Sequence, residues 1–175
     1  MAIRPCDVPA GALLLAYARS GYVDCYVTEV PASLSHAEYV EAFYSTALFG
    51  IERRLLAWIV SRPSTDRDVR ALATGDATTF AAWTVEARKP DQLLLADFRG
   101  RTRSWLMSAP ITDSLPGTRL YFGSAVVRST DARSGRTGMG FAFRALLGFH
   151  KLYSRLLLRA AVARLVQSKA GASGH

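Results

Sequence analysis

Cysteine and histidine are scarce in this chain, which has two cysteines and three histidines among its 175 residues. Cys6 and Cys25 cannot form a disulfide framework or a zinc site of the usual ligand spacing, and three scattered histidines add no metal-ligating cluster. We therefore predict neither a metal nor another cofactor. Two cysteines without an evident partner also favour a cytoplasmic location.

Long hydrophobic runs are missing as well. The apolar run from Ala10 to Ala18 is too short to span a bilayer, and Pro5, Asp7 and Pro9 interrupt the charged region that a signal peptide would need. The stretch from Phe141 to Val166 contains five basic residues, which is incompatible with a transmembrane helix. The sequence thus predicts no membrane span, and the first run is expected to form a short helix or turn packed on the domain.

Acidic residues are absent from the last quarter of the chain. All 14 lie at or before Asp131, together with 14 of the 22 basic residues, so the eight basic residues that follow carry the whole net charge of +8. Half of the residues are hydrophobic and 21% are charged, which excludes a disordered, collagen-like or coiled-coil chain. The length predicts one domain over residues 1–175, with a core at about 9–168 and a frayed tail at 169–175.

The first half of the sequence predicts one strand followed by two or three helices. Gly21 to Val30 is rich in β-branched and aromatic residues, and its alternation places Tyr22, Asp24 and Tyr26 on one face. Ser35 and Glu38 have the spacing of a capping box, and a helical pattern runs from there to about Val60, with a break near Gly50. A short helix follows Asp66 and ends at Gly75.

After Gly75 the hydrophobic period changes from helical to twofold. Short turns separate four predicted strands, at residues 80–88, 93–98, 102–109 and 119–128. Consecutive strands with such short connections form an antiparallel meander, because parallel strands need long crossovers. A polar loop then leads to a long helix over about 141–168. The element order predicts an α+β fold.

The element order resembles that of a known superfamily, the START-like, helix-grip proteins, which include polyketide cyclases and lipid-transfer domains. More specifically, the motifs Gly21-Tyr22-Val23-Asp24 and Gly148-Phe149-His150 are similar to an uncharacterised bacterial family. Its members occur alone or behind a Rossmann-type epimerase domain. Gly148 departs from that pattern, in which Pro often precedes Phe-His, so the helix kink that Pro would cause is not expected.

The resemblance implies a particular architecture and a class of ligand. In a helix-grip fold an antiparallel sheet wraps around the long C-terminal helix, with the helices inserted after the first strand, and a ligand cavity lies between sheet and helix. We therefore predict binding of an apolar or amphiphilic small molecule. Two alternatives stay open: a polyketide-cyclase-like enzyme, and a protein-interaction module that forms a homodimer or contacts an epimerase-like partner.

His150 is the first candidate for a residue lining that cavity. It lies within the predicted apolar face of the last helix, where His150 and Tyr153 would present polar groups to a bound molecule. An imidazole there could donate, accept or carry a proton, and His150 is the proton-transfer residue of the enzyme alternative. The favoured interpretation is nevertheless a core histidine bonded to a backbone carbonyl, so no catalytic role is assigned.

Side chains of the meander supply the other candidates. Trp83 and Trp105 lie in twofold-alternating runs, and Arg103 shares the parity of Trp105. Together they could form an apolar wall with one fixed cation, suited to an amphiphilic or acidic ligand. The alternative is that both tryptophans are ordinary core residues and that Arg103 lies in water at the end of a strand.

Two basic features point toward anions. The loop Gly135–Gly140 precedes a helix, but its glycine spacing matches neither a dinucleotide-binding motif nor a P-loop, so a hinge is favoured over a phosphate site. Arg144, Lys151, Arg155 and Arg159 form one stripe on the last helix. No nucleic-acid-binding motif accompanies the stripe, so we predict no nucleic-acid partner and favour a solvated outer face, with weak contact to an anionic surface as the alternative.

Overall fold

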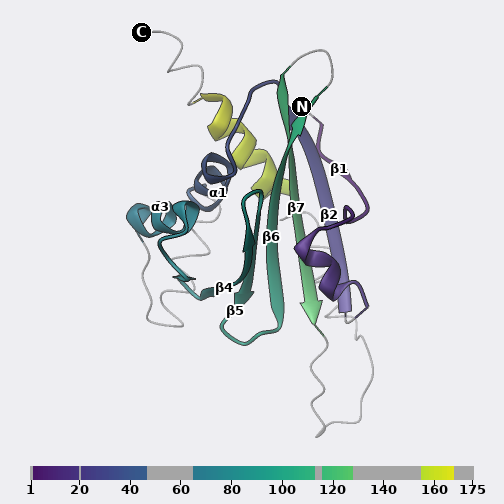
Figure 1. Ribbon diagram of the computed structural model, residues 1–175, viewed down its shortest axis with the longest axis vertical. Coiled ribbons are helices and arrows are strands. Elements are labelled where there is room, and N and C mark those ends of the chain that lie inside the picture. Colours follow the sequence, from purple (N-terminus) through teal and green to yellow (C-terminus); the bar gives the residue numbers. More distant parts are fainter. Residues whose placement is uncertain (1, 20, 47–64, 113–115, 128–154, 168–175) are drawn as a thin grey trace, which may run out of the picture.

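The computed structural model describes residues 2–19, 21–46, 65–112, 116–127 and 155–167 (Figure 1). Its elements are β1 (Arg4–Pro5), η1 (Leu13–Tyr17, a 3-10 helix), β2 (Gly21–Val30), α1 (His36–Tyr44), α3 (Asp66–Thr74), β3 (Thr79–Phe80), β4 (Trp83–Lys89), β5 (Gln92–Asp97), β6 (Thr102–Ile111), β7 (Gly117–Val127) and a C-terminal helix over 155–167. The described residues therefore form an α+β fold, as the element order predicts.

One seven-stranded antiparallel sheet organises the molecule, with strand order β1-β2-β7-β6-β5-β4-β3. The last four strands follow one another along the chain and pair as neighbours, which confirms the predicted meander. The first long strand, β2, pairs along its whole length with the last, β7, with Gly21 opposite Val127 and Val30 opposite Thr118. This pairing brings the start of the chain beside the end of the meander.

The two faces of the sheet are covered differently (Figure 1). On one face, which we call the helix-facing side, α1, α3 and the C-terminal helix pack against the sheet in a single hydrophobic cluster that includes Tyr26, Leu106 and Leu158. The other face is covered by the N-terminal segment through η1, around Leu14 and Trp105, and we call it the η1 side. The packing of η1 confirms the short N-terminal helix that the apolar run predicts.

Local sequence signals define the ends of both internal helices. Ser35 caps α1 and Thr65 caps α3, each in a reciprocal capping box whose partners are Glu38 and Asp68. Gly75 ends α3 in the left-handed conformation, with φ 94°, which costs glycine little because it has no Cβ. The capping box and the Gly75 terminus agree with the sequence prediction. The structure ends α1 at Tyr44, and the predicted continuation over 47–60 lies outside the described residues.

The strand predicted over residues 80–88 is wrong in two respects. It is divided by a tight turn at Ala81, whose φ is 51°, so that β3 and β4 form a small hairpin with Phe80 opposite Trp83. The twofold alternation also breaks inside β4, where a bulge lies between Val85 and Ala87. Neither irregularity is marked by a glycine or proline at its own position, which is why a simple alternation was expected.

The C-terminal helix is described only over 155–167. Its apolar side chains join the helix-facing cluster, and Arg164 donates to the backbone oxygen of Ser45 at 3.0 Å, at the carbonyl end of α1. No helix of the described residues is both long and apolar enough to cross a membrane.

Candidate functional site

The sheet separates the predicted site residues. Arg103 and Trp105 alternate with Ser104 on β6 and belong to the η1 side, where Trp105 lies opposite Leu94. Trp83 packs against the cluster on the helix-facing side. The proposed wall of two tryptophans and one cation therefore does not exist as a single surface. His150 and Tyr153 lie outside the described residues.

Trp105 is a fully buried core residue. Its exposed fraction is 0%, and its indole Nε1 donates to Oε1 of Gln92 at 3.0 Å. The same Gln92 oxygen accepts from the backbone N–H of Leu13 at 2.8 Å, which ties η1 to the sheet. With its polar atom satisfied and no exposed surface, Trp105 acts in packing, in agreement with the alternative interpretation of this residue.

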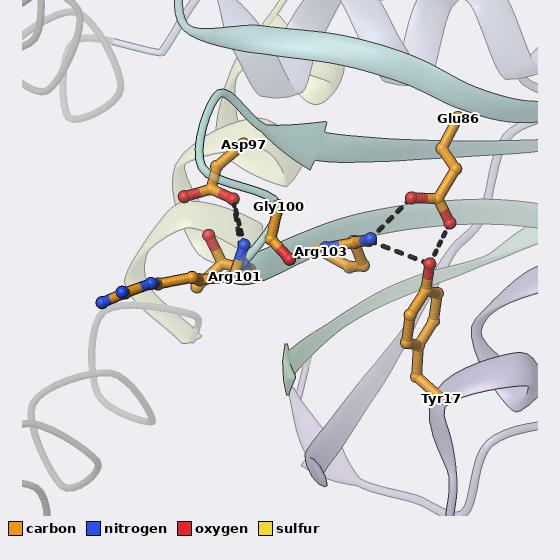
Figure 2. A network of polar contacts seen from close by, with 7 residues as sticks. Tyr17, Glu86, Asp97, Gly100, Arg101 and Arg103 are labelled. Carbon is orange, nitrogen blue, oxygen red and sulfur yellow. Dashed lines mark hydrogen bonds and ion pairs between the residues drawn. The ribbon is translucent and has the colours of Figure 1, made fainter. Parts of the chain in front are cut away.

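Arg103 is held in a polar network beneath η1 (Figure 2). Its Nε lies 2.7 Å from Oε2 of Glu86 and donates to the Tyr17 hydroxyl at 3.0 Å, while Nη1 donates to the backbone oxygen of Gly100 at 2.6 Å. Tyr17 in turn donates to Glu86, and the guanidinium stacks over its ring. The positive charge is thus neutralised within the fold, and the network fastens η1 to β4 and β6.

A different group of polar side chains occupies the helix-facing side. Asp24, Ser124 and Ser104 lie opposite one another on β2, β7 and β6, and we call them the polar row. Ser124 donates to Oδ1 of Asp24 at 2.5 Å, and the hydroxyls of Ser104 and Tyr44 are 3.0 Å apart. The neighbouring positions on this side, at Tyr26, Phe122 and Leu106, are buried and aromatic or apolar. The polar row therefore forms the edge of an apolar surface.

Two buried polar atoms on the helix-facing side, one in the polar row and one on β4, have no hydrogen-bond partner in the part of the chain that the structure describes. They are Oδ2 of Asp24 and Nε1 of Trp83. Buried polar atoms are almost always bonded, so an orphan of this kind needs a partner such as water or a ligand. The two residues lie on the same face of the sheet but about 19 Å apart across it, because four strand spacings of ~4.8 Å separate β2 from β4.

The surroundings of Asp24 are aromatic. Burial, and after it the charge of Asp24, raise the pKa of Tyr22 to about 12 and also raise the pKa of Tyr26. The Arg155 guanidinium lies 5.4 Å from the centre of the Tyr26 ring, at the start of the described part of the C-terminal helix. Asp24 thus lies next to two neutral phenols, one of which, Tyr26, also contacts the Arg155 cation. Arg155 was expected on a solvated stripe, and it is exposed but also in contact with the sheet.

His36, which the sequence interpretation did not single out, is a second buried titratable group. It begins α1 and its Nδ1 lies 3.3 Å from the Ser108 hydroxyl, while Nε2 is buried without a described partner. Burial, assisted by the positive charge of Arg88 and opposed by Asp91, lowers its pKa to about 4. His36 is therefore neutral at physiological pH. Its position directly after the capping Ser35 is visible in the sequence, but its burial is not.

The central part of the helix-facing side is closed by packing. Leu157, Leu158 and Leu165 of the C-terminal helix join the cluster formed by α1, α3 and the sheet. Two hollows, of about 280 and 500 Å³, lie beside the N-terminal segment around Cys6 and Asp7, and the larger one is also lined by Tyr22 and Asp24. The polar row lies at the border of this packed region, next to the half-buried Tyr22 and Val126.

Within the described ranges, no group of three or more His, Cys, Asp and Glu side chains is arranged to hold a metal ion. No protein-family model matches the chain, and no curated protein matches it significantly in sequence.

Proposed function

We propose that this protein binds an amphiphilic small molecule on the helix-facing side of the sheet, at the end marked by the polar row. The observation that carries the proposal is the unpartnered Oδ2 of Asp24, a buried carboxylate oxygen at the border of an apolar surface. A hydroxyl, amine or N–H group of a ligand would supply the missing donor, and a hydrogen bond to a charged acceptor is worth about 1.5–3 kcal/mol.

The charge and shape of the surface define the ligand class further. Tyr26, Phe122 and Leu106 are covered by the helices, but Tyr22 and Val126, on the other side of the polar row, are only half-buried. These two side chains offer apolar surface next to the row, so one end of the ligand is polar and its body apolar. The START-like, helix-grip resemblance supports the same class of ligand, and His150 and Tyr153 remain proposed contacts.

The first test identifies the occupant. Native mass spectrometry of the protein, purified gently from its own host, is expected to show a mass excess over the polypeptide that organic extraction removes. The excess is expected to disappear in Asp24→Asn and to persist in Thr28→Val. Thr28 is a matched control because it lies on the same face of β2 and its hydroxyl is also buried without a described partner.

A defined probe gives the second test. N-phenyl-1-naphthylamine is an apolar fluorophore with one N–H donor, and its emission increases in an apolar site. Asp24→Asn is expected to weaken its binding about fivefold to tenfold, the equivalent of roughly 1 kcal/mol, while Thr28→Val leaves binding unchanged. Equal affinity in both variants, or no co-purified molecule from repeated gentle preparations, contradicts the proposal.

A further inference from the structure

The two cysteines, which are 19 positions apart in the chain, meet in the fold. The Cys6 thiol donates to the sulfur of Cys25, with the two Sγ atoms 3.3 Å apart. Both are free thiols, Cys25 buried and Cys6 partly exposed. Their meeting continues the pairing of β1 with β2, in which Arg4 lies opposite Val27 and Pro5 opposite Tyr26.

The backbone geometry suits a covalent link. Register places Cys6 directly opposite Cys25, and the Cys6 N–H donates to the Cys25 carbonyl at 3.0 Å. Directly opposed, hydrogen-bonded residues of antiparallel strands have Cα atoms about 5.5 Å apart, within the range of about 4.4–6.8 Å that disulfides use. The sulfurs would need to approach by about 1.3 Å, from 3.3 Å to about 2.0 Å.

Small molecules can reach the pair. Cys6 lines both hollows beside the N-terminal segment, and Cys25 lines the larger one. Burial raises the pKa of both thiols, but their mutual hydrogen bond lowers that of Cys6 and raises that of Cys25. Cys6 is therefore the thiol that ionises first, and it is also the more exposed one.

From this geometry we propose that Cys6 and Cys25 are a modification site, a dithiol that a hydroperoxide converts into an intramolecular disulfide. The Cys6 thiolate attacks the peroxide, the O–O bond breaks, and Cys6 becomes a sulfenic acid. The departing alkoxide or hydroxide takes up the proton that the Cys6 thiol released on ionising. The Cys25 sulfur then attacks the sulfenic sulfur, the S–O bond breaks, and water leaves. In total, two thiols and one hydroperoxide give one disulfide, one alcohol and one water.

The link has a structural consequence on the η1 side. Between the two cysteines lies η1, whose Leu14 is fully buried and whose Tyr17 joins the Arg103 network. A disulfide would close this segment into a covalent loop and hold it against the sheet. Cys25 lies on the face opposite the polar row, but the hollow beside it also reaches Asp24, so oxidation is tested separately from ligand binding.

The test uses the whole protein with hydrogen peroxide as the oxidant. After oxidation and alkylation under denaturing conditions, peptide mapping without reductant is expected to find the Cys6 and Cys25 peptides joined, with a mass loss of two hydrogens and no dimer. Dithiothreitol is expected to reverse the change. The rate is expected to increase with pH between about 7 and 9, since the thiolate is the nucleophile.

Two variants distinguish a paired site from two separate thiols. In Cys6→Ala, Cys25 is expected to lose its thiol about tenfold more slowly than in the wild type, because it is buried and has no thiolate beside it. In Cys25→Ala, Cys6 is expected to progress to a sulfinic acid or to link two molecules. Should Cys25→Ala fail to fold, Cys6→Ala at the partly exposed position still decides the question. Survival of both thiols at peroxide levels that oxidise free glutathione, or sulfinic acid on Cys6 in the wild type without a linked peptide, overturns the proposal.

Discussion

Trp83 and Trp105 lie on opposite faces of one sheet. Trp83 of β4 is opposite Asp97, and Trp105 of β6 is opposite Leu94. Asp97 and Leu94 differ by an odd number of positions on β5, so their side chains point to opposite sides. The two tryptophans therefore belong to different hydrophobic clusters, and substitutions at them should have different effects on stability.

Trp105→Phe is expected to lower the free energy of unfolding by about 2 kcal/mol. The smaller ring leaves a cavity in the η1-side cluster and removes the hydrogen bond to Gln92. Trp83→Phe removes a donor that has no described partner, and its cost is expected to stay within about 0.5 kcal/mol. Urea unfolding of both variants checks the difference, and equal losses would contradict the assignment of the two faces.

Glu86→Gln is expected to loosen η1. The ion pair with Arg103 is only partly exposed, with side-chain exposures of 12% for Arg103 and 30% for Glu86, so its loss is expected to cost about 1 kcal/mol. Hydrogen exchange should become faster at the amides of η1 before those of the sheet. Glu29→Gln is the control, because Glu29 also pairs with arginines but is more exposed. Equal effects of the two variants on amide exchange in η1 would contradict the inference that the Arg103 network holds η1 against the sheet.

Stability is expected to fall as the pH decreases from about 6.5 to 4, in part because of His36. In the folded protein the pKa of His36 is about 4, whereas the unfolded value is about 6.5. Between these values the unfolded chain binds more protons, so the free energy of unfolding falls with falling pH and is fully present only above about 6.5. The total contribution is on the order of 3 kcal/mol.

His36→Gln isolates that contribution. Carboxyl groups also titrate in this range, so the informative quantity is the difference in slope between the wild-type and variant curves of unfolding free energy against pH. The variant is expected to show a shallower slope between pH 4 and 6.5 and a parallel curve above it. Two parallel curves throughout would show that His36 is not held neutral by burial.

Gly123→Ala is expected to be among the most costly small substitutions. A Cβ at this position would lie 2.5 Å from Cδ2 of Leu14, and 3.0 Å from both the Asp24 carbonyl and the Trp105 ring. Since the backbone and the buried ring cannot yield, the loss is expected to reach about 2–3 kcal/mol. Gly100→Ala is the control, with open space but a φ of 64°, at about 1 kcal/mol. Differential scanning calorimetry should rank Gly123→Ala below Gly100→Ala in melting temperature.

Much of the fold could be predicted because its signals are local. The alternation of Gly21–Val30, the capping box at Ser35 and the glycine after Thr74 act within a few residues of the structure they define. The short connections of the meander similarly left only an antiparallel arrangement. The bulge in β4 could not be predicted, because it depends on contacts with β5 and not on a residue type within β4.

The candidate site was harder to predict because it depends on register between distant strands. Tyr22, Asp24 and Tyr26 were correctly assigned to one face, but nothing in the sequence aligns Asp24 with Ser124, 100 positions away. Arg103 and Trp105 were correctly predicted to share one face of their strand. The sequence does not show how the faces of different strands align, so Trp83 was wrongly grouped with them. The same limitation hid the meeting of Cys6 with Cys25.

The bulge in β4 changes which face of the sheet its side chains point to, so that residues next to one another contact different layers of the protein. Because of the extra residue, Glu86 and Ala87 both serve the η1 side, and Arg88 returns to the helix-facing side, where its Nη2 donates to the Leu72 carbonyl at 2.6 Å near the end of α3. In a strand without the bulge, Glu86 on the η1 side would place Ala87 on the helix-facing side and Arg88 on the η1 side, away from α3. A single inserted position thus lets one short strand anchor the 3-10 helix through a carboxylate and an α-helix through a guanidinium.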